Sequence, residues 1–178
     1  MTKWICAVLG VLGISGCSTT IEDYRDTTPP LVLEDYFKGT LDAWGMFQDR
    51  SGKVIKRFHV VIDAKWEGPV GTLDERFTYD DGSTQRRVWT LTAHGDGRYT
   101  GTAGDVVGVA EGQARGNAFR WKYVMALPVD GKVYHVDFDD WMYLVDDKVM
   151  LNRSEMSKFG FHLGEVTLSF TRRSEASP

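Results

Sequence analysis

The stretch RWKYVMALPVDGKVYHVDFDDWM, residues 120–142, decides the fold. Apolar and polar residues alternate through both of its halves, which is the pattern of half-buried β-strands. Asp130-Gly131 separates the halves and is a typical two-residue hairpin turn. With the turn there, Trp121 lies opposite Asp140, one face is almost wholly apolar, and the other carries Arg, Lys, His and Asp. Burial of a single face fixes a register in this way, so we predict an antiparallel hairpin.

Similar turn signals recur along the chain, each between alternating segments. They are Ser51-Gly52, Asp80-Asp81-Gly82, Gly95-Asp96-Gly97, Gly116-Asn117 and Asp146-Asp147. Such spacing predicts an all-β protein, an antiparallel up-and-down barrel of the lipocalin or calycin type with about 8 to 10 strands. A membrane-spanning barrel would need an apolar outer band and a polar lumen, and the charged outer face disfavours it.

Small residues face large ones across the hairpin that turns at Gly116-Asn117. The expected order sets Ala114, Gly112, Ala110 and Gly108 opposite Phe119, Trp121, Tyr123 and Met125. A curved sheet fills its interior in this way without overpacking, so these glycines are expected to serve packing rather than nucleotide binding.

The N-terminus predicts export and lipidation. A short apolar run follows Lys3, too short to span a bilayer and typical of a signal peptide over residues 1–16. Ile14-Ser15-Gly16-Cys17 resembles the bacterial lipobox, so Cys17 is expected to carry acyl chains such as palmitate. By resemblance to enterobacterial lipoproteins, Ser18 after the cysteine favours the outer membrane, with the protein facing the periplasm. The alternative is a plain export signal with an incidental cysteine.

The processed chain is expected to hold one domain. Residues 17–30 are polar, end in Pro-Pro and predict a lipidated tether, while residues 31–178 form the barrel domain, beginning with a short helix within 31–39. Processing leaves 178 − 16 = 162 residues, and loss of Lys3 takes the net charge from −4 to −5. That charge argues against nucleic acid as a partner. Cys6 leaves with the signal, so no disulfide is expected.

Two acid–base pairs are expected to face inward. A two-residue turn at Asp146-Asp147 sets Asp140 opposite Arg153, and a turn at residues 80–82 sets Glu75 opposite Arg87. The two pairs could stabilise one end of the barrel by linking neighbouring strands. Alternatively, they could anchor a ligand in an apolar pocket, with an arginine binding an anionic head group. The candidate ligand-binding residues are Trp89, Trp121, Tyr123, Phe138, Asp140, Arg153, Glu75 and Arg87.

No motif for catalysis, a metal or a cofactor is present in the sequence. His135, Asp137 and Asp139 share a strand face, but side chains two apart on a strand diverge, which predicts a solvated charged face rather than a metal site. Asp140 or Glu75 could act as a general base. An arginine partner would lower the pKa of such a carboxyl, which counts against that role and leaves catalysis undecided.

Five segments resemble an uncharacterised bacterial lipoprotein family, the domain of unknown function 3833. They are AWGMFQDRSGKVIKRF (43–58), TLDERFTYDDG (72–82), GNAFRWKY (116–123), DDWMYLVDD (139–147) and LNRSEMSKFGFHLGEVTLSFTRR (151–173). The resemblance implies a Gram-negative lipoprotein of unknown activity. By the same resemblance, the gene is expected to adjoin one for a cyclopropane-fatty-acid-synthase-like enzyme, which would link the protein to membrane-lipid modification or transport. The family resemblance implies no catalytic residues for this chain.

Three hypotheses for function follow. The first is a lipid-anchored envelope protein whose barrel binds an amphipathic or acyl ligand, such as a lipid. The second is an isomerase or lyase that acts on a modified lipid, and the third is a packed structural lipoprotein without a small ligand. An interior cavity of about 300 Å³ or more would separate the first two from the third.

Overall fold

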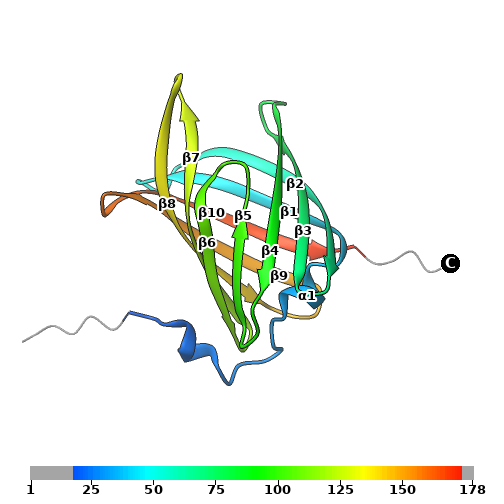
Figure 1. Cartoon of the computed structure of the whole chain (residues 1–178). Helices are drawn as coiled ribbons and strands as arrows, with labels where there is room; N and C mark the ends of the chain where they lie inside the picture. The colour runs from blue at the N-terminus through cyan, green and yellow to red at the C-terminus, as the bar shows by residue number, and fades with distance from the viewer. Residues whose placement is uncertain (1–17, 174–178) are drawn as a thin grey trace, which may run out of the picture.

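The chain folds as a closed barrel of ten antiparallel strands (Figure 1). The computed structural model describes residues 18–173. The strands are β1 (Gly39–Asp49), β2 (Val54–Glu67), β3 (Val70–Tyr79), β4 (Thr84–Ala93), β5 (Arg98–Thr102), β6 (Val106–Arg115), β7 (Ala118–Val129), β8 (Lys132–Leu144), β9 (Val149–Lys158) and β10 (Phe161–Arg172). Strands adjacent in sequence are adjacent in the barrel, and β10 pairs with β1. The predicted fold class is confirmed.

The predicted signal peptide, residues 1–16, and Cys17 lie outside the described residues. Within residues 18–173, no helix combines the length and the apolar character that crossing a bilayer requires. All ten strands of the closed barrel lie between Gly39 and Arg172, so a chain that starts at Ser18 carries every strand pair.

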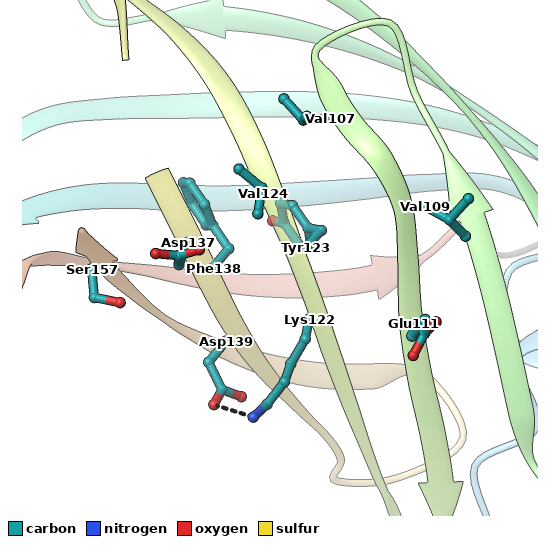
Figure 2. A pocket seen from close by; sticks show the side chains of 10 residues that line it. All are labelled: Val107, Val109, Glu111, Lys122, Tyr123, Val124, Asp137, Phe138, Asp139 and Ser157. Atoms are coloured by element: carbon teal, nitrogen blue, oxygen red, sulfur yellow. Dashed lines mark ion pairs between the residues drawn. The ribbon is translucent and has the colours of Figure 1, made fainter. Parts of the chain in front are cut away.

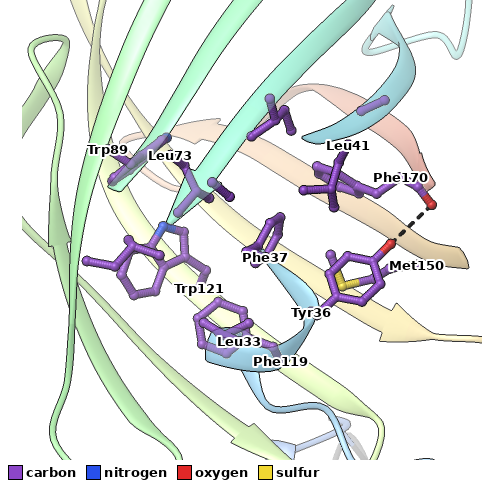
Figure 3. Close-up of a cluster of buried hydrophobic side chains, with 14 of the residues drawn as sticks. Leu33, Tyr36, Phe37, Leu41, Leu73, Trp89, Phe119, Trp121, Met150 and Phe170 are labelled. Carbon is purple, nitrogen blue, oxygen red and sulfur yellow. Dashed lines mark hydrogen bonds between the residues drawn. The ribbon is translucent and has the colours of Figure 1, made fainter. Parts of the chain in front are cut away.

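One end of the barrel is closed by helix α1 (Leu33–Tyr36), a single turn within the segment where a helix is predicted. So short a helix has little stability alone and depends on packing. Leu33, Tyr36 and Phe37 are buried in the barrel core (Figure 3). The Tyr36 hydroxyl donates to the carbonyl oxygen of Phe170 at 3.2 Å, and Trp66 Nε1 donates to that of Phe37 at 3.1 Å.

The segment predicted as a tether packs on the outer wall of the barrel. It contains the 3-10 helix η1 (Ile21–Tyr24). The Tyr24 ring lies 5.9 Å from the Trp141 ring and 5.4 Å from the Tyr143 ring, and Glu22 forms an ion pair with Arg115 at 3.0 Å. The chain directly after Cys17, the residue predicted to be lipidated, is therefore fixed to the barrel.

Two predicted hairpin registers are confirmed. Trp121 of β7 lies opposite Asp140 of β8, and Glu75 of β3 lies opposite Arg87 of β4. Each pair follows from its turn because burial of one face leaves a single acceptable register.

The β6–β7 register is only partly as predicted. Ala114 and Gly112 lie opposite Phe119 and Trp121, but the register then shifts between Val107 and Glu111. Val106 instead of Gly108 therefore faces Met125. Gly108 has a φ of +74°, a conformation that glycine tolerates, and its position within the shift marks a β-bulge.

The predicted Asp140/Arg153 pair is wrong. Asp140 lies opposite Ser154, and Arg153 lies opposite Trp141 on the outer face, where it forms an ion pair with Glu165 at 2.6 Å. The turn is longer than expected: the last strand pair joins Leu144 to Met150. The Asp146 carboxylate accepts from the backbone nitrogens of Lys148 and Val149 at 2.8 Å each, which stabilises this loop. Shifting a register by one residue sends every side chain to the other face.

The small-facing-large packing can be tested at Gly112. A Cβ there would lie 2.3 Å from Trp121 Cε3 and 2.6 Å from the Arg120 carbonyl oxygen. We expect Gly112→Ala to lower the free energy of unfolding by about 1–3 kcal/mol, since backbone cannot move aside freely. Urea denaturation measures this. Gly104→Ala is the matched control, because a Cβ at Gly104 meets no described atom within 4 Å. Equal stabilities of the two variants would contradict the packing argument.

Candidate functional site

Among residues 18–173, Asp140 is a buried carboxyl without a cationic hydrogen-bond partner. Alternation along β8 turns it inward, and its exposed fraction is 6%. The Tyr123 hydroxyl of β7 donates to Oδ2 at 3.1 Å, and the Ser154 hydroxyl of β9 donates to Oδ1. Both neighbouring strands thus supply one neutral donor each, which satisfies the oxygens but places no cation in hydrogen-bond contact with the carboxylate.

Burial raises the pKa of Asp140 to about 7, although the hydrogen bonds from Ser154 and Tyr123 act in the opposite direction. The pKa of Tyr123 is raised well above its ordinary value by burial and by the Asp140 charge. The tyrosine therefore stays a hydroxyl donor at any physiological pH. Near neutral pH the carboxyl can either hold or release a proton.

Arg87 forms a second polar cluster, toward the opposite end of the barrel from α1. Its Nη1 lies 3.5 Å from Glu75 Oε2, and its Nε lies 2.9 Å from Asp105 Oδ2. The guanidinium also lies 5.1 Å from the centroid of the Phe77 ring. Burial acts to lower the pKa of Arg87, but the two carboxylates outweigh it and the net shift is upward. This arginine is therefore fully engaged by two acids.

Glu75 is the second inward carboxyl whose pKa rises. Its side chain is 13% exposed, and burial raises its pKa to about 7 against the attraction of Arg87. The charges of Asp105 and Asp140 push it in the same direction as burial. The neighbouring Asp74 points outward and forms an ion pair with Arg86 at 2.8 Å, as strand alternation requires.

Aromatic side chains surround Asp140 and leave a small cavity. The Trp89 ring lies 5.8 Å from the Trp121 ring and 5.4 Å from the Tyr123 ring, each edge to face. Phe138 stacks on Tyr123 with 5.1 Å between ring centroids. The cavity holds about 70 Å³, and its wall includes Asp140 and the α1 residue Leu33. This is below the roughly 300 Å³ of an ordinary ligand pocket, so the interior accommodates a small group only.

A larger groove lies on the outer wall where β6 bulges away from β7 (Figure 2). It measures about 420 Å³. Its apolar lining comes from Val107, Val109, Val124, Tyr123 and Phe138, and its polar lining from Glu111, Lys122, Asp137, Asp139 and Ser157. Val109 is 57% exposed and Val107 42%, so apolar side chains of this groove face the solvent. Tyr123 lines both this groove and the interior cavity.

Asp139, predicted to lie on a solvated charged face, forms ion pairs on the outer wall. It contacts Arg120 at 2.6 Å and Lys122 at 3.5 Å. In the described residues, no group of three side chains is arranged to hold a metal ion.

The structure brings together most of the residues predicted for the site. Trp89, Trp121, Tyr123 and Asp140 share the cavity, while Arg87 and Glu75 form the second cluster. Arg153 is excluded because it lies outside the barrel. Sequence reasoning missed Ser154 and Asp105. Ser154 can be placed beside Asp140 only when the observed β8–β9 register is known. Asp105 lies in the loop between β5 and β6, where strand alternation does not predict the direction of a side chain.

The sequence matches a family model described as "Protein of unknown function (DUF3833)" over residues 11–172. The chain belongs to this family. No curated protein matches it in sequence.

Among solved structures, the DUF3833 barrel resembles the S-type phycobiliprotein lyase CPES from Guillardia theta. The TM-score is 0.57 at 10% identity, covering 83% of this chain and 95% of the lyase. A de novo designed fluorescence-activating β-barrel gives a TM-score of 0.44 at 12% identity, with coverage of 80% and 99%. The structure of EF1p2_mFAP2b bound to DFHBI gives 0.43 at 9%, with coverage of 78% and 94%. The likeness to the lyase supports the barrel fold.

The raised pKa of Asp140 has a consequence for stability. Between pH 4 and 7 the folded protein keeps a proton that the unfolded chain, with its ordinary pKa near 3.8, has lost. The free energy of unfolding therefore falls as the pH rises through this window. We expect Asp140→Asn to make that fall less steep, by at most about 1 kcal/mol per pH unit. Some fall should remain in the variant, because the pKa of Glu75 is also raised.

Urea denaturation at pH 4.5, 6 and 8 measures the difference. Asp147→Asn is the control, since Asp147 is exposed in the loop after β8. Parallel pH curves for the wild type and Asp140→Asn would show that Asp140 titrates as an ordinary aspartate.

Proposed function

We propose that the DUF3833 barrel binds a small amphipathic molecule, with its polar group at Asp140 and its apolar part in the outer groove. The observation that carries this is the position of Tyr123. Its hydroxyl donates to Asp140, and the residue lines both the interior cavity and the groove at the β6 bulge. A polar head and an apolar tail on one molecule would match these two environments.

The sizes of the two spaces support this division. A cavity of about 70 Å³ has room for the volume of about two water molecules, far too little for an acyl chain. The groove, at about 420 Å³, falls within the range of ordinary ligand sites. An acyl chain held wholly inside the barrel, as in a hollow lipid carrier, does not fit this interior.

The same proposal includes a lipid anchor on Cys17 and a place in the cell envelope, at the outer membrane and facing the periplasm. It rests on the lipobox-like residues Ile14 to Cys17. A lipid anchor would hold the barrel close to the bilayer, the natural source of amphipathic molecules. A role in membrane-lipid modification or transport would follow from that location.

The anchor is testable by metabolic labelling. We expect the wild-type protein to incorporate radiolabelled palmitate and Cys17→Ala to incorporate none, because the thiol would carry the lipid. Cys6→Ala serves as the control and should label normally, since Cys6 lies within the expected signal peptide. Labelling that survives Cys17→Ala would contradict the anchor.

Ligand binding is testable by native mass spectrometry. The chain from Ser18 onward would be exported to the periplasm of a Gram-negative host, and copurifying molecules would be extracted and identified. We expect a discrete bound mass, reduced by Val109→Asp, which places a charge in the exposed groove without altering the core. Val133→Asp is the control, because Val133 is 64% exposed and lies outside this groove.

A bare mass for the wild type, together with no uptake of added octyl-chain amphiphiles, would contradict the binding proposal. The packed structural barrel would then be the better account. An equal loss of ligand in both variants would show that the effect is not specific to the groove, and would contradict the placement of the ligand there.

A second candidate function is acid–base catalysis on such a ligand. Two inward carboxyls, Asp140 and Glu75, have pKa values raised to about 7, where a general acid or base is most effective. The sequence-based objection assumed an arginine beside Asp140, and its hydrogen-bond partners are hydroxyls instead. Turnover lost in Asp140→Asn with ligand affinity retained would support an isomerase or lyase.

A further inference from the structure

The groups around the two inward carboxyls carry an excess of acid. Within the described part of the chain, the cluster contains three carboxyls, Glu75, Asp105 and Asp140, and one guanidinium, that of Arg87. Arg87 forms ion pairs with both Glu75 and Asp105. Its charge is therefore not free to neutralise an incoming anion, and the charge of Asp140 is balanced by no hydrogen-bonded cation.

This arrangement opposes an anionic head group. An anion at the cavity would lie beside the Asp140 carboxylate, and Arg153, once expected to attract it, lies on the outer wall with Glu165. Like charges in a poorly solvated site repel strongly. The sequence-based idea of an arginine anchor therefore does not hold in this interior.

We infer that the ligand's head group is a cation, a primary or N-methylated ammonium group of a small alkylamine, bound between the Asp140 carboxylate and the surrounding aromatic rings. This rests on the proposed function and adds to it the chemical class of the ligand. The charge-assisted hydrogen bond to a carboxylate is about twice as strong as a neutral one. It would also relieve the cost of burying Asp140 as an ion.

The aromatic wall supports the same chemistry. Trp89, Trp121 and Tyr123 meet at 5.4–5.8 Å around the cavity that Asp140 lines. Indole and phenol faces attract cations within about 6 Å of the ring centroid. The size agrees as well, because about 70 Å³ admits an ammonium head and little more.

Binding should depend on pH through the carboxyl. The groups that face Asp140 are Tyr123 from β7 and Ser154 from β9, and the charged groups that act on it are Arg87 across the interior and Asp139 beside it on β8. Glu75 and Asp105 complete the acidic side. Asp140 changes charge near pH 7 because burial raises its pKa, so a cation should bind more weakly below that pH.

The experiment compares three probes with the same chain: octylammonium, octanol and octanoate. Isothermal titration calorimetry on the chain from Ser18 onward would follow their binding at pH 8 and pH 5.5, with circular dichroism as the check of folding. We expect octylammonium to bind at least about tenfold more tightly than octanol at pH 8, and octanoate most weakly. The preference should shrink at pH 5.5, where the ammonium stays charged and Asp140 gains a proton.

Asp140→Asn should reduce the preference at pH 8 to within about threefold, and Asp147→Asn should leave it intact. The wild-type pH profile keeps the test informative if Asp140→Asn does not fold. Equal binding of all three probes, or a preference for octanoate, would overturn the cationic head group while the binding function stands. No binding of any probe would overturn both.

Discussion

The interior of this barrel is organised around one carboxyl that, within residues 18–173, has no hydrogen-bonded cation. Asp140 lies among tryptophan, tyrosine and phenylalanine rings, and its oxygens accept from the hydroxyls of Tyr123 and Ser154. Hydroxyls donate hydrogen bonds to the carboxylate but carry no positive charge. Burial therefore raises the pKa of Asp140 to about 7, where the carboxyl is partly protonated at neutral pH. An apolar residue of similar size would serve a packed core better, which makes the site a candidate for function.

The rest of the architecture isolates this carboxyl. Helix α1 closes the nearby end through Tyr36 and Phe37, while the ion pairs of Arg87 fill the interior further along. What remains is a small cavity, which has room for the polar head group of a ligand but not for a whole lipid. The bulge in β6 provides a larger apolar surface directly outside, with Tyr123 between the two spaces.

Much of this could be predicted from the sequence, because alternation and turn residues determine which face of a strand is buried. The β7–β8 and β3–β4 registers follow from Asp130-Gly131 and from the loop at residues 80–82. The β8–β9 register could not be predicted in this way. The Asp146 carboxylate accepts hydrogen bonds from the backbone of Lys148 and Val149 and so lengthens the loop, and the sequence Asp146-Asp147 alone does not indicate these bonds. Because the register differs by one residue from the predicted one, Ser154 instead of Arg153 lies beside Asp140. The carboxyl therefore has a neutral neighbour where a cation was predicted. The β6 bulge escaped prediction because Gly108 also fits a regular strand of small residues.

The most direct measurement is the pKa of Asp140 itself. Carbon-13 NMR of the side-chain carboxyls, followed from pH 3 to 9 and assigned by loss of one resonance in Asp140→Asn, reports that value without reference to any ligand. We expect the carboxyl to titrate near pH 7, well above the range of an ordinary aspartate. Titration near pH 4 would contradict the account, since it would mean that Asp140 is solvated or paired with a cation and that the interior offers no special place for a charged head group.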